Sequence, residues 1–318
     1  MRDGFGRAID YLRLSITDRC NLRCRYCMAE GARFLPEGEL LHFDELLRVC
    51  RAATELGITR FKVTGGEPLA RPGVAEFIRE LKRLPGARSV TLTTNGLLLE
   101  PLLGELRDLD GINISLDTPD PAAYAALTGT DAADRVLRAV RRCAEFGIRT
   151  KVNCVLLEDA SGAEALAGLA EALPVDVRYI QLMPIGTGGA MAGAEPAALL
   201  ERLRLRWPDL QPVDESRGNG PARYFASDRL CGRIGLIDAV SHRFCDSCNR
   251  IRLTADGRLK PCLCYEDSLD LKTPLRAGAS DADVIRLLRR AILRKPLQHA
   301  FDRPDRVTER QSMSRIGG

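Results

Sequence analysis

Three cysteines near the amino terminus have the spacing of a cluster-binding site. Cys20, Cys24 and Cys27 lie within eight residues, and no fourth cysteine or histidine is close to them in the sequence. Iron–sulfur clusters are normally held by four thiolates, so three ligands leave one iron open to an exogenous molecule. Such an iron can activate a substrate as well as pass electrons. The alternative is a zinc site completed by a distant fourth ligand, since structural zinc prefers four protein ligands.

A second group of thiols lies near the carboxyl terminus and consists of Cys245, Cys248, Cys262 and Cys264. From spacing alone, this pattern suits a zinc ribbon as well as a second iron–sulfur site. Arg250 and Arg252 lie between its halves, and on a strand both guanidinium groups would point to the same side. A pair of this kind favours bidentate contacts with phosphate or carboxylate, the alternative being a solvated strand face.

Alternating strand and helix patterns must position these groups. Six β-rich runs are expected as strands: Tyr11–Ile16, Ile58–Val63, Ser89–Thr94, Ile112–Leu116, Thr150–Leu156 and Val177–Met183. Helical patterns separate them, such as His42–Leu56 and Asp134–Phe146, each followed by a glycine. This order predicts a parallel α/β sheet, either doubly wound or curled into a barrel. Cys20 and the Gly65-Gly66-Glu67-Pro68 turn follow strands, at the edge where such folds gather their chemistry.

The pattern changes after residue 186. Loops are expected at Gly186–Ala194 and Val213–Ala222, and helices at Pro196–Leu205 and Asp281–Leu293. We interpret the carboxyl-terminal part as a layer packed on the sheet, and divide the chain into residues 1–225 and 226–318. The polar end, Arg303–Gly318, should be mobile unless it docks.

Composition excludes several function classes. The 318 residues carry a net charge of +4 without dense basic runs, which argues against a nucleic-acid partner. No signal peptide or apolar span of bilayer length is present, so we expect a cytoplasmic protein without a membrane partner. Eleven cysteines, an odd number, fit metal or cluster ligation better than a disulfide framework. No P-loop or G-x-G-x-x-G turn occurs, so any nucleotide phosphates must be held in another way.

The first cysteine group resembles the hallmark of the radical S-adenosylmethionine (SAM) superfamily. Tyr26 is the aromatic residue expected before the third cysteine, and Gly65–Pro68 matches the superfamily's SAM-amino-group turn. In that superfamily the open iron chelates the amino and carboxyl groups of SAM, and one electron releases a 5′-deoxyadenosyl radical. Over nearly the full chain the sequence is similar to the GTP 3′,8-cyclase family of molybdenum cofactor biosynthesis. The segments in which this similarity is most specific are residues 15–28, 64–69, 93–96, 245–253 and 314–318.

The resemblance implies an incomplete (βα)6 TIM-like barrel closed by a carboxyl-terminal iron–sulfur layer. It implies SAM and two [4Fe–4S] clusters as cofactors, the second cluster binding the guanine of GTP. The radical removes the ribose 3′ hydrogen, and the carbon radical adds to C8 to give (8S)-3′,8-cyclo-7,8-dihydroguanosine 5′-triphosphate. As partners it implies a reductant protein and cyclic pyranopterin monophosphate synthase, which would receive the product. The sequence leaves the oligomeric state open, with a homodimer as one alternative.

The resemblance also assigns roles to individual residues. The cluster ligands are Cys20, Cys24, Cys27, Cys245, Cys248 and Cys262. The SAM contacts are Tyr26, Gly66, Ser115 and Met183. The GTP contacts are Arg13, Lys62, Thr93, Lys151, Arg178, Arg250 and Arg252. The terminal Gly317 and Gly318 would reach into the active site for the cyclisation, whereas a frayed end is the default for any terminus.

Three positions depart from the family pattern. Lys62 stands where an arginine is usual. A phosphate contact there would be made by a single ammonium group and not by a bidentate guanidinium. Ala29 replaces a usual proline, and Cys264 is an additional cysteine that leaves two alternatives for the third ligand of the second cluster. Two other functions remain to be distinguished: a radical SAM peptide-modifying enzyme with an auxiliary cluster, and a zinc-stabilised binding module without catalysis.

Overall fold

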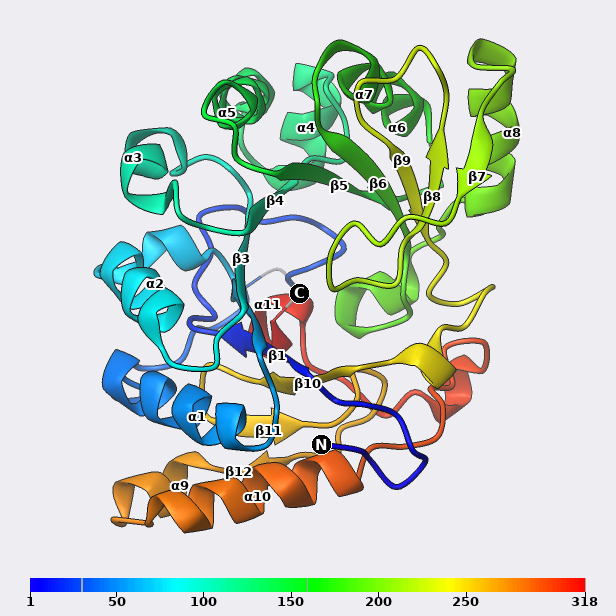
Figure 1. The fold of residues 1–318 in the computed structure, drawn as a ribbon. Coiled ribbons are helices and arrows are strands. Elements are labelled where there is room, and N and C mark those ends of the chain that lie inside the picture. Colours follow the sequence, from blue (N-terminus) through cyan, green and yellow to red (C-terminus); the bar gives the residue numbers. More distant parts are fainter. Residues whose placement is uncertain (30, 159, 318) are drawn as a thin grey trace.

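Twelve strands form one curved sheet in the computed structural model, which describes residues 1–318 except 30, 159 and 318 (Figure 1). The strands are β1 (Tyr11–Ser15), β2 (Arg60–Thr64), β3 (Ser89–Thr94), β4 (Gly111–Ser115), β5 (Thr150–Leu156), β6 (Asp176–Gln181), β7 (Gln211–Val213), β8 (Arg223–Ala226), β9 (Ile234–Ile237), β10 (Arg250–Leu253), β11 (Arg258–Lys260) and β12 (Leu269–Asp270). Their order across the sheet is β12-β11-β10-β1-β2-β3-β4-β5-β6-β9-β8-β7. All neighbours from β10 to β9 are parallel, and the pairs at each edge are antiparallel.

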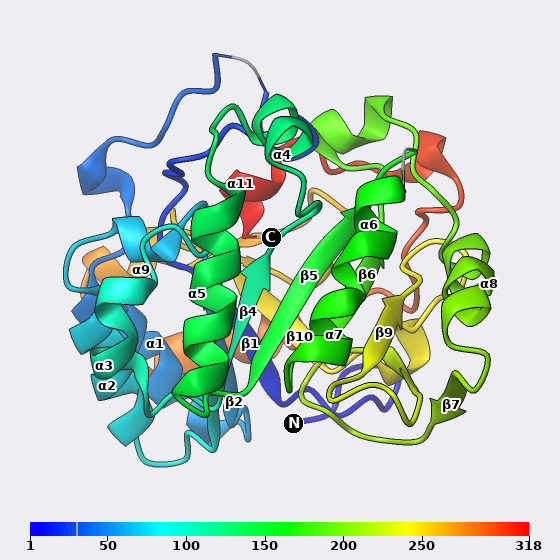
Figure 2. The same cartoon turned by 90° about the horizontal axis from the view of Figure 1, so that it is seen from above.

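Helices cover the outside of the curve, as Figure 2 shows from above. They are α1 (Phe43–Glu55), α2 (Val74–Arg83), α3 (Leu103–Leu106), α4 (Pro121–Thr128), α5 (Ala133–Glu145), α6 (Ser161–Leu166), α7 (Gly168–Ala172), α8 (Pro196–Arg206), α9 (Lys272–Arg276) and α10 (Asp281–Leu293). The short helix α11 (Met313–Ile316) lies inside the curve. Among these described helices, none is long and apolar enough to cross a membrane.

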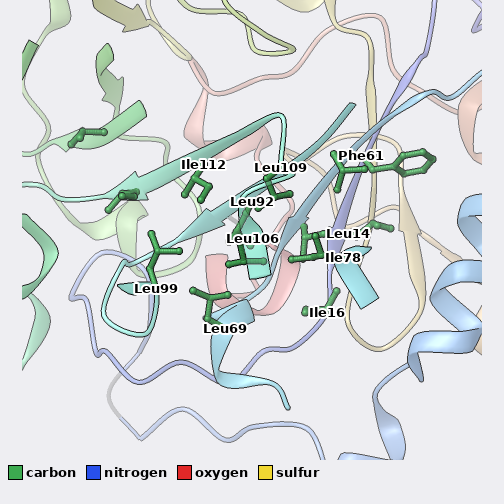
Figure 3. Packing of buried hydrophobic residues seen from close by; sticks show 14 of the residues in the cluster. Leu14, Ile16, Phe61, Leu69, Ile78, Leu92, Leu99, Leu106, Leu109 and Ile112 are labelled. Atoms are coloured by element: carbon green, nitrogen blue, oxygen red, sulfur yellow. The ribbon is translucent and has the colours of Figure 1, made fainter. Parts of the chain in front are cut away.

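The two faces of the strands have different chemistry. In β3, Val90 and Leu92 are fully buried on the outer side, and Leu92 packs with Ile78 and Leu106 of the covering helices (Figure 3). The intervening Thr91 and Thr93 line a cavity on the inner side of the curve. Because side chains of a strand alternate between faces, the same period that fills the outer core also supplies the lining of the lumen.

The sequence predicted this architecture closely. Each of the six expected strands occurs with its ends within two residues of the expected ones, and α1, α5, α8 and α10 occupy the expected helical segments. The partial barrel is therefore confirmed as a parallel-dominated α/β sheet. The carboxyl-terminal strands were not foreseen in their positions: β9 extends the parallel run beside β6, and β10 extends it beside β1. The division at residues 225 and 226 falls inside β8 and stays a prediction, as does the role of the last segment as a closing iron–sulfur layer.

Candidate active site

The lumen of the curved sheet holds a cavity of about 450 Å³. Residues from both ends of the strands line it, including Ser115 at the carboxyl end of β4 and Gly111 at its amino end. The first cysteine group follows β1 and therefore lies at the carboxyl end. Cys248 precedes β10, which runs parallel to β1, so the second group lies at the amino end. The two groups of thiols face the lumen from opposite ends.

The first cysteine loop presents three thiols toward the lumen. The Leu22 N–H donates to Cys20 Sγ over 3.4 Å, and the Asn95 amide nitrogen lies 3.9 Å from the same sulfur. Burial raises the pKa of Cys24 above its usual range and that of Cys27 to about 12. These thiols therefore become thiolates only beside a compensating positive charge, which the irons of a cluster provide.

The Gly65-Gly66-Glu67-Pro68 turn packs directly on this loop. The Gly66 N–H donates to Thr17 O over 2.7 Å, and the Glu67 N–H donates to Arg19 O over 2.7 Å. A Cβ atom on Gly66 would lie 2.4 Å from Arg19 O, which no side chain allows. Since Gly66 also lines the cavity, the glycine serves both the approach to a ligand and the contact with the cysteine loop.

Glu67 is fully buried and ties this turn to the end of β3. Its carboxylate accepts hydrogen bonds from the Thr94 hydroxyl over 2.7 Å and from the Asn95 N–H over 2.7 Å. Burial raises its pKa to about 7 although these hydrogen bonds lower it. The turn, the cysteine loop and β3 therefore hold one another at the carboxyl end of the sheet.

Asp117 is a partly buried acid at the carboxyl end that sequence reasoning did not assign. It accepts a hydrogen bond from the Tyr26 hydroxyl over 2.8 Å and another from the Val155 N–H over 2.7 Å. Burial raises its pKa to about 6. The Ser115-Leu116-Asp117 sequence at the end of β4 was the available signal, but a separation of 91 residues conceals the contact with Tyr26.

The second cysteine group separates its two candidate third ligands. Cys262 lines the lumen together with Cys245 and Cys248, whereas Cys264 is fully buried in a small apolar cluster and accepts a hydrogen bond from the Ala300 N–H over 3.3 Å. Since only Cys262 faces the lumen with the other two thiols, the geometry favours it as the third ligand.

Positive charge surrounds these second thiols. The buried Lys295 donates to Arg250 O and to Pro261 O, each over 2.9 Å. Burial would raise the pKa of the Cys248 thiol, but Lys295 and Arg250 lower it to about 7. Arg7 donates to Cys245 O over 3.0 Å, and its guanidinium is paired with Asp3 over 2.6 Å. Sequence reasoning missed both Arg7 and Lys295, because neither lies in a recognisable motif.

Three cations form a row across neighbouring strands. Arg13 of β1 is in register with Arg252 of β10 on one side and with Lys62 of β2 on the other. All three line the lumen, and burial followed by mutual repulsion lowers the pKa of Lys62 and of Arg252 well below their usual ranges. Like charges directly opposite each other destabilise a sheet, so this row favours a polyanionic ligand.

Two further predicted cations stand on the opposite side of the lumen. Lys151 of β5 lies 3.8 Å from the Asp176 carboxylate and donates to the Tyr224 hydroxyl over 3.0 Å. Burial and the neighbouring Arg178 nevertheless lower the pKa of Lys151 to about 7. Arg178 of β6 donates to the Asn153 side-chain oxygen over 2.6 Å, and the absence of a side chain at Gly235 leaves space beside it.

The carboxyl-terminal tail docks inside the curve, where α11 lies in both views (Figures 1 and 2). Ile316 is buried, and Arg315 lies 3.5 Å from the Asp18 carboxylate of the first cysteine loop. Arg252 donates to Gly317 O over 2.7 Å. The tail thus reaches both the cysteine loop and the cation row; Gly318 lies outside the described residues.

The structure brings the predicted site residues together. Every predicted cluster, SAM and GTP residue lines the lumen, and Gly317 is held beside it by Arg252. The donor sets fit iron–sulfur clusters, because each consists of three soft thiols and Cys20 and Cys245 accept backbone N–H groups of the kind that tune such clusters. Among the residues that the structure describes, no three His, Cys, Asp or Glu side chains are grouped closely enough for a single metal ion.

Comparisons with known proteins place this site in a family. Residues 14–167 match the Radical SAM superfamily, and residues 175–301 match Molybdenum Cofactor Synthesis C. The crystal structure of Streptococcus suis SuiB bound to S-adenosylmethionine superimposes with a TM-score of 0.66 at 14% identity, covering 96% of this chain and 77% of that one. At that identity the likeness shows the fold alone.

Curated relatives are more similar in sequence. A GTP 3′,8-cyclase of Clostridium perfringens strain SM101 is 38% identical over the whole of both chains. The GTP 3′,8-cyclase of Paracoccus denitrificans is 42% identical over 99% of this chain and 95% of that protein. Human molybdenum cofactor biosynthesis protein 1 is 39% identical over 94% of this chain and 48% of that protein. Full-length identity at this level, with both cysteine groups on one lumen, establishes that the chain belongs to the GTP 3′,8-cyclase family of radical SAM enzymes.

Proposed function

We propose that this chain binds GTP in the lumen between two iron–sulfur clusters and cyclises it, with SAM as cofactor, in the first step of molybdenum cofactor biosynthesis. The row of Arg252, Arg13 and Lys62 carries the proposal. Lys62 is buried and Arg13 and Arg252 are half-buried, and three cations side by side repel one another. A nucleoside triphosphate supplies several negative charges in one flexible chain.

The carboxyl end of the lumen is the proposed SAM side. Cys20, Cys24 and Cys27 would hold the first cluster there, and the proposed SAM contacts, Tyr26, Gly66, Ser115 and Met183, line the same end. When bound, SAM and its cluster supply a carbon-centred radical that abstracts a hydrogen atom. The chain itself fixes the position of the cofactor, since Asp117 holds Tyr26 and the Gly66 turn is joined to the cysteine loop.

The amino end is the proposed guanine side. The second cluster would be held there by Cys245, Cys248 and Cys262. Arg250 lies beside them at the start of β10, two residues before Arg252. A base held at this end would leave its ribose in the middle of the lumen, between the two cofactors. The phosphates nearer the ribose would lie beside the row of Arg252, Arg13 and Lys62. The far end of the phosphate chain would reach Lys151 and Arg178 on β5 and β6 across the lumen, with Thr93 lining the wall between.

The docked tail gives the last two residues a proposed role beside the substrate. Gly317 has a φ of 80°, and a Cβ atom on it would lie 2.8 Å from the Ser15 Cβ, so only glycine fits there. Arg252 joins this residue to the cation row. Tail position and substrate position are thereby connected, which supports a role of Gly317 and Gly318 in cyclisation.

The proposal includes the partners that the chemistry needs. A reductant protein would supply the electron, and cyclic pyranopterin monophosphate synthase would receive the product. All eleven cysteines are free, which supports a reducing compartment such as the cytoplasm. Sedimentation of the reconstituted protein would decide between a monomer and the homodimer alternative.

Activity of the reconstituted enzyme tests the function directly. Anaerobic protein with both clusters should convert GTP to the cyclic product and release 5′-deoxyadenosine when SAM and dithionite are added. Two full clusters correspond to roughly eight irons per chain. Cleavage of SAM without consumption of GTP would refute the assignment of GTP as substrate, and a colourless protein that binds zinc would refute the assignment of the two iron–sulfur clusters.

A further inference from the structure

A glycine-containing loop closes part of the amino end of the lumen. Residues 215–221, called here the 215–221 loop, connect β7 to β8 and follow Val213 in the segment that the sequence identified only as a loop. The lumen is lined by five consecutive residues of this loop: Arg217, Gly218, Asn219, Gly220 and Pro221. The loop is therefore a wall of the substrate cavity.

Ion pairs and a hydrogen bond hold this wall at both sides. Arg217 contacts both carboxylate oxygens of the buried Asp176 at the start of β6, with Nε 3.0 Å from one oxygen and Nη2 2.9 Å from the other. Its Nη1 lies 3.1 Å from Glu215, which in turn pairs with Arg233 over 3.0 Å. The Asn219 amide lies 3.4 Å from the Ser89 hydroxyl at the start of β3. The loop thus spans the amino ends of β3 to β6.

The inner side of the 215–221 loop meets the two cations on β5 and β6. Lys151 Nζ donates to Arg217 O. A Cβ atom on Gly218 would lie 3.2 Å from Lys151 Nζ, and one on Gly220 would lie 3.6 Å from Arg178 Nη1. Because neither glycine has a side chain, backbone and cations bound a small space at this end. Backbone amides without side chains beside fixed cations favour an anion.

This position corresponds to one end of the proposed substrate. The second cysteine group lies beside β10, whereas Lys151 and Arg178 lie on β5 and β6, across the lumen. A nucleotide whose base is held near β10 therefore directs its phosphates toward the 215–221 loop. In a nucleoside triphosphate the terminal phosphate would lie against the 215–221 loop. The shorter phosphate chain of a diphosphate or monophosphate would end before it reaches the loop.

The geometry points to the 215–221 loop as the end wall of the triphosphate pocket, which selects nucleoside triphosphates over shorter nucleotides. This inference rests on the proposed function. Gly220 admits the terminal phosphate beside Arg178, and Arg217 is a positioning residue that acts through Asp176 and through its own carbonyl on Lys151.

Gly220→Ala tests the pocket, because the added methyl group fills part of the space beside Arg178. Gly220 does not have a positive φ, and its added Cβ would make ordinary contact with Arg178 at 3.6 Å, so the backbone accepts alanine. Gly104→Ala is the control, because a Cβ atom there has no neighbour within 4 Å. Asn219→Asp is a second, isosteric variant that adds a negative charge to the wall.

Anaerobic equilibrium binding of GTP, GDP and GMP to protein of checked iron content is the assay. Wild type and Gly104→Ala should bind GTP at least about tenfold more tightly than GDP, the value of one charged contact. Gly220→Ala and Asn219→Asp should each raise the Kd of GTP about tenfold and change that of GDP less than about twofold.

The outcomes separate the two proposals. A wild-type protein that does not bind GTP refutes the proposed function. A wild type that prefers GTP, with variants that keep the preference or weaken GTP and GDP equally, refutes the role of the 215–221 loop alone. If one variant loses iron, the other still tests the loop, because Gly220→Ala acts by size and Asn219→Asp acts by charge.

Discussion

Lys151 should take up a proton when GTP binds. Its pKa lies at about 7 in the unliganded protein, because burial and Arg178 outweigh the attraction of Asp176. A triphosphate beside it would favour the ammonium form and raise this pKa. At pH 8 about 0.9 of the Lys151 amines are neutral, so binding should take up nearly one proton at this residue; at pH 6 it should take up about 0.1.

The sign for affinity follows from the same linkage. Proton uptake on binding means that GTP affinity falls as pH rises, by about tenfold per pH unit for each proton taken up. Lys62 contributes in the same direction, since its pKa is also lowered in the unliganded protein. The contribution of Lys151 is therefore the difference between wild type and Lys151→Met, about one proton at pH 8 and almost none at pH 6.

Titration calorimetry at pH 8 in HEPES and in Tris measures the number of protons taken up, because the two buffers differ in ionisation enthalpy and the observed heat depends on the protons exchanged. Lys272→Met is the control, since Lys272 pairs with Glu39 and does not line the lumen. Equal proton uptake by wild type and Lys151→Met at pH 8 would refute the placement of Lys151 beside the phosphates.

Four further predictions concern the two cysteine groups, the row of cations and the tail. Cys20→Ala should lose about half of the iron and all SAM cleavage, measured as 5′-deoxyadenosine; retained cleavage would contradict its assignment as a ligand. Cys262→Ala should also lose about half of the iron, whereas Cys264→Ala should keep it, because Cys264 is buried away from the lumen; the reverse result would exchange the two assignments. Arg252→Ala should lower GTP affinity roughly tenfold to a hundredfold. Removal of the last two residues should leave iron content and SAM binding intact but stop product formation. Normal turnover by the shortened chain would show that the tail is dispensable.

The sequence was sufficient to predict the six central strands, β1 to β6, and the chemically active groups at their carboxyl ends. The order of β-rich runs and helical patterns predicted these strands, and the glycines after α1 and α5 marked the ends of those helices. The cysteine spacing identified both groups of thiols. These features are local, so short segments of sequence contain them.

Other features depend on contacts between distant segments. The choice between Cys262 and Cys264 could not be made from spacing, because it depends on which thiol the chain directs into the lumen after β11. The pairing of Tyr26 with Asp117 and that of Arg217 with Asp176 join different strands and loops. The position of β10 beside β1, which creates the row of cations, arises from sheet order and leaves no periodic signal.

The row of cations also connects stability with function. The interior of a closed (βα)8 barrel is usually a packed core of branched aliphatic side chains. Here β10, β1 and β2 place Arg252, Arg13 and Lys62 side by side in the lumen, where burial and repulsion disfavour their charged forms. A polyanion removes that repulsion only in the folded state, so GTP should stabilise the native protein through binding linkage. The same residues that weaken the empty barrel therefore provide its affinity, and replacing Lys62 with methionine should raise the melting temperature of the ligand-free protein while reducing its stabilisation by GTP.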